Sequence, residues 1–149
     1  MADSKTQLSD SQNTKMHDLI VIIDKIASKH SATVGELEEM TGRRLRPIPG
    51  QFREYKTDLR KQQALQGVKT CILAKDDLRC IELIVNPNKS INPTDIQSYM
   101  GDWTRFGDDS EKVFEDNLVL IYQKEWGQIR FDFKNANHPA LYAVYITSS

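Results

Sequence analysis

The sequence predicts an α+β protein with a mainly helical N-terminal half and an antiparallel sheet in its C-terminal half. Three observations favour this class. Apolar residues recur every three or four positions from Met16, two β-rich runs flank Asp76 and Asp77, and three further strand patterns occupy residues 118–147. We expect a three-helix module with a β-hairpin, followed by an antiparallel β-meander with one short helix.

Length and composition bound the domain organisation. The 149 residues, 39% of them hydrophobic, suffice for one domain or for two small subdomains that share a core. Residues 1–13 are polar and are expected to form a disordered tail, ahead of a basic module at 14–85 and a sheet subdomain at 86–149. Without an apolar run of membrane-spanning or signal-peptide type, we expect an intracellular protein with no membrane contact. It would lie in the cytoplasm, or in the nucleoid or nucleus if it binds DNA.

Two helices are predicted in the N-terminal half. The first follows the helical period Met16, Leu19, Ile20, Ile23, Ile26, Ala27 and His30. The second, in "SATVGELEEMTG", has Thr33 as N-cap, Glu36 at the capping-box position and Gly42 as its stop. Its Val34, Leu37 and Met40 are expected to face the core.

A third helix is predicted over residues 51–65, after a break at Pro47 and Pro49. Phe52, Tyr55 and Leu59 form an apolar stripe, and Arg53, Lys56 and Arg60 form a basic stripe beside it. We therefore expect Phe52 and Leu59 to be buried and Arg53 and Arg60 to be exposed, with Gly67 ending the helix.

The runs 68–75 and 78–85 are predicted to form a hairpin that turns at Asp76 and Asp77. That turn would pair Lys75 with Leu78 and Leu73 with Cys80, so Cys71 and Cys80 would be diagonal neighbours. Diagonal positions lie roughly 7 Å apart or more, which is too far for an unstrained disulfide. We expect both cysteines to serve in packing.

Three helices followed by a hairpin resemble the winged helix-turn-helix family of nucleic-acid-binding modules. The resemblance covers about residues 14–85 and rests on "ATVGELEEMTG" and "LRKQQALQGVKTCIL". It implies that the third helix is the recognition element and that residues 75–79 form the wing. The linker "GRRLRPIPG" is longer than the usual turn of the motif. No family is suspected for the C-terminal half.

The charge is strongly uneven along the chain. Residues 42–75 carry nine Lys/Arg and two Asp/Glu, a net charge of +7, although the whole chain has −1. A basic island of this kind attracts polyanions. The predicted nucleic-acid-binding residues are Arg43, Arg44, Arg46, Arg53, Lys56, Arg60 and Lys61. The alternative is that these are the solvated face of an ordinary amphipathic helix.

The second half is predicted to contain one helix and three strands. Asn92 is a cap, Pro93 lies in the first turn, Asp95 occupies the capping-box position and Gly101 ends the helix. Residues 102–117 are expected to be a loop with at most one helical turn. The strands are predicted at 118–124, 128–134 and 140–147, with Ile129, Phe131 and Phe133 alternating with polar residues. The first helix and the Asn92 helix are expected to back the sheet.

Catalytic motifs are absent from the sequence. It has no phosphate loop, HExxH, GxSxG or Gly-rich dinucleotide turn, so we expect no enzymatic activity, no catalytic or metal-binding residues and no cofactor. The acidic residues Asp108, Asp109, Glu111, Glu115 and Asp116 fit either a cation site or a solvated loop. The histidines His17, His30 and His138 fit structural positions, and the loop aromatics Trp103, Phe106 and Trp126 fit either base stacking or closure of the core.

These patterns favour a small non-enzymatic protein that binds the phosphate backbone of DNA or RNA through a basic helix and loop. A protein partner or a homodimer could use the C-terminal sheet. The alternative is a protein-binding module, of inhibitor or immunity type, that acts through its acidic C-terminal half. Convergence of the basic residues on one exposed face would favour nucleic acid.

Overall fold

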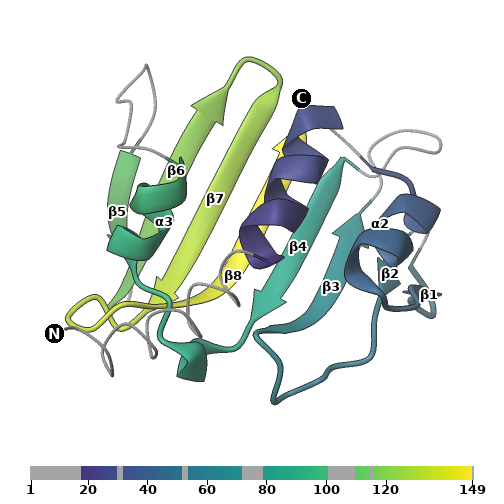
Figure 1. The fold of residues 1–149 in the computed structure, drawn as a ribbon, viewed down its shortest axis with the longest axis horizontal. Coiled ribbons are helices and arrows are strands. Elements are labelled where there is room, and N and C mark those ends of the chain that lie inside the picture. The colour runs from purple at the N-terminus through teal and green to yellow at the C-terminus, as the bar shows by residue number, and fades with distance from the viewer. Residues whose placement is uncertain are drawn as a thin grey trace, which may run out of the picture.

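A computed structural model describes residues 18–29, 32–51, 54–71, 79–100, 110–114 and 116–148. Its centre is one eight-stranded antiparallel sheet with the strand order β1-β2-β3-β4-β8-β7-β6-β5 (Figure 1). The strands are β1 (Arg46–Pro47), β2 (Tyr55–Lys56), β3 (Leu65–Cys71), β4 (Cys80–Val85), β5 (Ser110–Phe114), β6 (Asn117–Lys124), β7 (Gly127–Lys134) and β8 (Ala140–Ser148). Two four-stranded meanders are thus joined through their last strands, β4 and β8.

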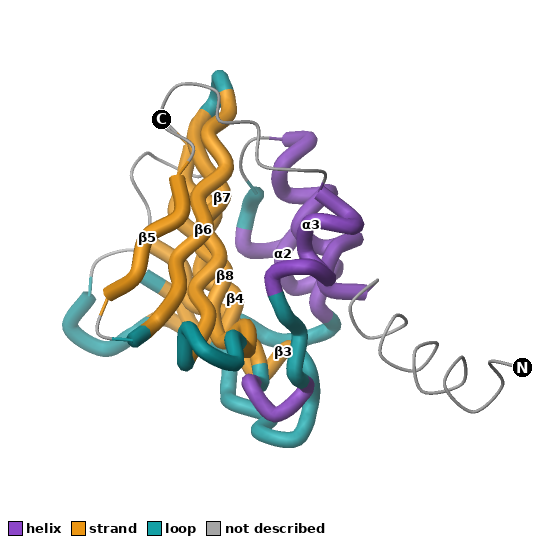
Figure 2. The backbone as a smooth tube through the Cα atoms, turned by 90° about the vertical axis from the view of Figure 1, so that its left-hand side faces the viewer, coloured by secondary structure: helices purple, strands orange, loops and turns teal. Residues whose placement is uncertain are grey.

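All described helices lie on one face of this sheet (Figure 2). They are the N-terminal helix over residues 18–29, α2 (Val34–Thr41) and α3 (Pro93–Met100), with a short 3-10 turn, η1 (Pro87–Lys89), before α3. The side of the sheet that carries no described helix is called the open face. Within the described part of the chain, no helix is long and apolar enough to cross a membrane.

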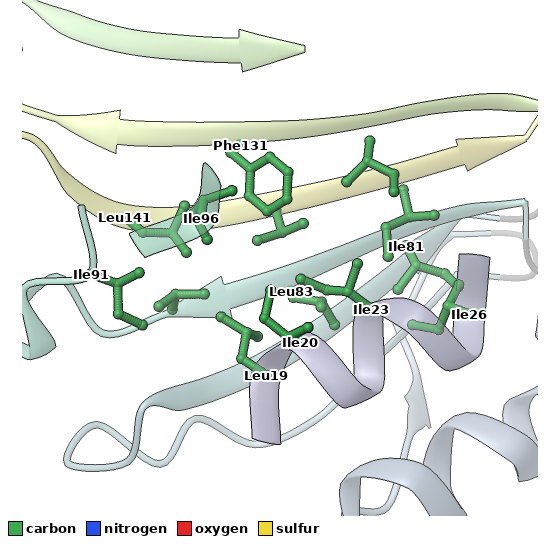
Figure 3. Close-up of a cluster of buried hydrophobic side chains, with 14 of the residues drawn as sticks. Leu19, Ile20, Ile23, Ile26, Ile81, Leu83, Ile91, Ile96, Phe131 and Leu141 are labelled. Carbon is green, nitrogen blue, oxygen red and sulfur yellow. The ribbon is translucent and has the colours of Figure 1, made fainter. Parts of the chain in front are cut away.

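The N-terminal helix and the sheet share one hydrophobic core. Leu19, Ile20, Ile23 and Ile26 are buried against the sheet, as the helical period predicted (Figure 3). The same cluster includes residues from both halves of the chain, among them Leu83, Ile96, Phe131 and Val144. The α+β class is therefore confirmed, and the expected backing of the sheet by helices is confirmed with it.

Both predicted helix caps are present. Thr33 Oγ1 accepts from the backbone of Glu36, whose carboxylate accepts from the Thr33 N–H, both at 3.1 Å. Gly42 ends α2 in the left-handed conformation (φ 66°), which an L side chain rarely adopts. Asn92 and Asp95 exchange the same pair of bonds at the start of α3, each at 2.9 Å.

The winged-helix expectation is wrong. Residues 55–56 form a strand and residues 57–64 run without helix into β3, so the predicted third helix does not exist and Gly67 lies inside a strand. The backbone N–H of Thr57 donates to the Val68 carbonyl and its Oγ1 accepts from the Val68 N–H, both at 2.9 Å. These tertiary hydrogen bonds to β3 override the local helical pattern. The N-terminal half is therefore part of the large sheet.

The burial predicted for the apolar stripe of this helix is also wrong at Leu59. Leu59 is 56% exposed, whereas Arg60 is exposed as expected. Phe52 and Arg53 lie outside the described residues.

Two further expectations need correction. The hairpin of β3 and β4 exists, but Cys71 lies directly opposite Cys80, so its register differs from the predicted one by two residues. Cys80 is a free thiol.

Residues 110–114 form strand β5, where a loop was expected. The three C-terminal strands and their meander order are confirmed.

Candidate functional site

Strand register separates the two faces of the sheet. Val68, Leu83, Val144, Phe131 and Leu120 lie opposite one another across five strands, and all of them are buried in the core. Because side chains alternate along a strand, the adjacent row must point to the open face. That row runs through Arg46, Lys56, Lys69, Glu82, Tyr145, Arg130 and Ile121, one residue from each of seven strands.

The row begins with three adjacent cations, Arg46, Lys56 and Lys69, which we call the basic row. Adjacent strands lie about 4.8 Å apart, so the three side chains follow each other over roughly 10 Å. All three are exposed, and no ion pair joins any of them to an acidic residue in the described part of the chain. Like charges directly opposite each other are destabilising. The basic row is thus a local concentration of positive potential.

A hollow of about 490 Å³ adjoins the basic row. Lys56 and Lys69 contribute to its wall together with the apolar side chains of Ile48, Leu59 and Ile84. Leu59 lies over β3 because Gly67 leaves room for it: a Cβ at Gly67 would come within 2.7 Å of Leu59 Cδ2. Leu59, which the helical period predicted to be buried, is therefore an exposed apolar residue in the wall of this hollow.

The centre of the open face carries a network of charged and aromatic side chains. Arg130 donates to both carboxylate oxygens of Asp132, at 2.6 and 2.9 Å, and its guanidinium lies 5.3 Å from the ring centre of Tyr145. The Tyr145 hydroxyl donates a long hydrogen bond, 3.4 Å, to Glu82. Asp132 is only 3% exposed, and the hydrogen bond to it is the main cause of a raised Arg130 pKa. The network holds these groups in a fixed arrangement.

A β-bulge adds Tyr142 to this network. Asp132 pairs with Ala143 and Phe133 pairs with Leu141, so Tyr142 is an extra residue on β8. The Tyr142 pKa is raised, first by burial and then by the negative charge of Asp132. Lys134 lies over its ring with 5.3 Å between Nζ and the ring centre. Both tyrosines thus meet cations on their rings and carboxylates near their hydroxyls.

The tyrosine environments predict a loss of stability at alkaline pH. Burial, and after it the charge of Glu82, raises the Tyr145 pKa from 10.0 to about 12. A raised pKa in the folded state means that the stabilisation is complete below pH 10 and is lost as pH rises through about 12. Denaturant unfolding across this range should show a decline that is smaller in the variant Tyr142→Phe/Tyr145→Phe. An equal decline in the variant would assign the effect to other groups.

The seven sequence-predicted site residues do not converge. Arg46 and Lys56 share the basic row, whereas Arg44, Arg60 and Lys61 are exposed in loops. Arg43 is buried, and Arg53 lies outside the described residues. Lys69, Arg130, Tyr142 and Tyr145 were missed, although strand alternation marked Arg130 as solvent-facing. These residues lie together because of the register between strands, which the sequence did not predict.

The other candidate residues remain without a site. His138 and Trp126 lie in the turns that follow β7 and β6, and His17, His30, Trp103, Phe106, Asp108, Asp109 and Glu115 lie outside the described residues. No group of His, Cys, Asp or Glu in the described part of the chain is arranged to hold a metal ion.

Fold and site together define a small α+β protein with helices on one face of an eight-stranded antiparallel sheet and a basic, tyrosine-bearing row on the other. The chain matches no protein-family model and no curated protein. Among solved structures it is similar to a DUF4309 family protein, YjgB, from Bacillus subtilis subsp. subtilis strain 168, at 15% identity, 79% coverage of each chain and a TM-score of 0.48. This similarity leaves the function open.

Proposed function

We propose that the protein is a non-enzymatic binding protein that takes up a single-stranded nucleic acid, DNA or RNA, on its open face. The proposal rests on the basic row, three exposed cations in register on the sheet face that carries no described helix. Proteins that bind single strands combine positive charge along the backbone with aromatic side chains for the bases. Here Tyr145 lies on the same row, two strands beyond Lys69.

The geometry favours a single strand over a duplex. A flat row on a sheet face offers no protruding helix for the major groove, and the recognition helix that would have supplied one is absent. An extended backbone can instead lie across the strands, with phosphates near the cations and one base near the apolar wall of the hollow. Such contacts give affinity with little sequence preference.

Salt dependence provides the test. Each phosphate contact to a single strand contributes about −0.7 to the slope of log K against log salt, so three contacts predict a slope of about −2. The variant Arg46→Gln/Lys56→Gln/Lys69→Gln should bring that slope close to zero and weaken binding to an unstructured oligonucleotide. Fluorescence anisotropy over a salt series measures both quantities.

The matched control removes the same charge elsewhere. Arg44→Gln/Arg60→Gln/Lys61→Gln neutralises three exposed loop cations and should keep most of the slope. If both triple variants lose the slope equally, binding depends on diffuse net charge and the basic row has no special part. If wild type does not bind at low salt, where phosphate contacts are least screened, the proposal is wrong.

A protein partner is the second candidate, because Tyr and Arg are enriched at protein interfaces. Tyr142, Tyr145 and Arg130 lie together on the open face, and Asp132 holds Arg130 in place. This hypothesis moves the expected surface from the acidic residues of the C-terminal half to its tyrosines. It becomes the better account if the oligonucleotide assay gives no binding.

A further inference from the structure

Arg43 is a buried cation that does not belong to the basic row or to the charged and aromatic network of the open face. It follows Gly42, the C-cap of α2, and only 6% of it is exposed. Its Nη2 donates to Gln63 Oε1 at 2.6 Å and to the Leu65 carbonyl, both uncharged acceptors. Its Nη1 is buried and has no hydrogen-bond partner among the described residues. Among the described residues, the guanidinium therefore has an unused donor and forms no ion pair with an acidic side chain.

An arginine in this state is costly to the fold. A guanidinium stays protonated, and a buried charge without an ionic partner destabilises the folded state. Burial lowers the Arg43 pKa, and the positive charge of Arg60 lowers it further. A residue that served packing alone would be better replaced by an apolar side chain of similar length.

A cavity of about 550 Å³ lies where Arg43 is buried, between the N-terminal helix, the end of α2 and residues 62–65. Leu19, Ile22 and Met40 form apolar parts of its wall, and Lys25 and Lys89 add two further cations. The size is typical of sites for small molecules. Asp18 also lines the cavity but is exposed, and no ion pair joins it to Arg43.

We propose that this cavity binds the oxyanion group, carboxylate or phosphate, of a small and partly apolar molecule. An oxyanion bound beside the Arg43 guanidinium supplies the missing negative charge, with Lys25 as a further cation in the cavity wall. The apolar part of the ligand lies against Leu19, Ile22 and Met40. This site is separate from the basic row and does not depend on the function proposed for it.

The first experiment compares four probes by isothermal titration calorimetry and thermal unfolding of the full chain. The probes are octanoate, octyl phosphate, inorganic phosphate and neutral octanol. We expect at least one octyl anion to bind about tenfold or more tightly than octanol, since one charge-assisted hydrogen bond is worth that much. The tighter octyl anion identifies the head group. Equal binding of octanol, equal binding of inorganic phosphate, or no binding of either octyl anion overturns the proposal.

The second experiment separates a ligand site from a structural arginine. Arg43→Met should abolish the preference for the anions, because it removes the buried cation from the cavity wall. A lower melting temperature with unchanged anion binding would show that Arg43 acts only as a structural donor. Met40→Trp, which fills the cavity and leaves Arg43 in place, should also block the octyl anions. Arg46→Gln/Lys56→Gln/Lys69→Gln should bind them like wild type.

Discussion

Phe131→Ala should lower the free energy of unfolding by about 3–5 kcal/mol, because it removes a fully buried aromatic side chain from the middle of the sheet. Phe131 lies in the hydrophobic core (Figure 3) and is 0% exposed. In the sheet register it lies between Val144 and Leu120, which are buried as well. Its ring meets that of Tyr122 edge to face, with centroids 5.7 Å apart and an interplanar angle of 82°. The cavity left behind cannot close easily, since β6 and β8 hold β7 on both sides.

Leu59→Ala is the matched control. Helical periodicity marked Leu59 for the core, whereas the structure leaves it 56% exposed, so its truncation should change stability by no more than about 0.5 kcal/mol. Denaturant unfolding of both variants, with an unchanged m-value, measures the two effects. A loss of several kcal/mol in Leu59→Ala would support a buried helical position and contradict the exposed, non-helical segment described for residues 57–64.

Local hydrogen bonding explains which elements could be predicted. Thr33 with Glu36 and Asn92 with Asp95 each form a closed pair of bonds within four residues, so their patterns specify the helix starts wherever the chain lies. The meander is similarly local, because each of its turns connects strands that are neighbours both in sequence and in the sheet.

The failures share the opposite cause. Thr57 is hydrogen-bonded to Val68, and Arg60 is hydrogen-bonded to Gln66. These partners lie six or more residues away, and no sequence pattern near residues 51–60 indicates them. The stripe of Phe52, Tyr55 and Leu59 fits a helical period, but Tyr55 also favours a strand and pairs with Thr70. Contacts made at long range decided between the two.

The candidate sites show the same division. The charge count marked residues 42–75 as a basic island, and Arg46, Lys56 and Lys69 of the basic row all lie within it. It could not distinguish Arg46, which is exposed on the row, from Arg43, which is buried three residues earlier. Residue counts give the net charge of a segment. The register of the strands determines which of its charged side chains lie on the same face of the sheet.

Substitution of Gly127 in the turn between β6 and β7 should also be strongly destabilising, as in the core at Phe131, although this turn lies at the end of the sheet. Gly127→Ala should lower the free energy of unfolding by about 2–4 kcal/mol, through backbone strain and overpacking. Gly127 has φ 156°, and a Cβ there would lie 2.0 Å from the Thr147 carbonyl oxygen and 2.7 Å from Ser148 Cα. These are backbone atoms of β8, so no side-chain rotation relieves the clash.

Relief would require β7 and β8 to separate at their shared end, where Gly127 pairs with Ser148 and Gln128 pairs with Thr147. Gly35→Ala provides the control, since a Cβ at this helical position meets nothing within 4 Å. That variant should be more stable than wild type by up to about 1 kcal/mol, because alanine favours the helix. Hydrogen exchange should locate the damage of Gly127→Ala in the amides that join β7 to β8. Wild-type stability in Gly127→Ala would mean that β8 does not approach the turn as closely as described, and Tyr145, on the same strand, would then lose its fixed place on the open face.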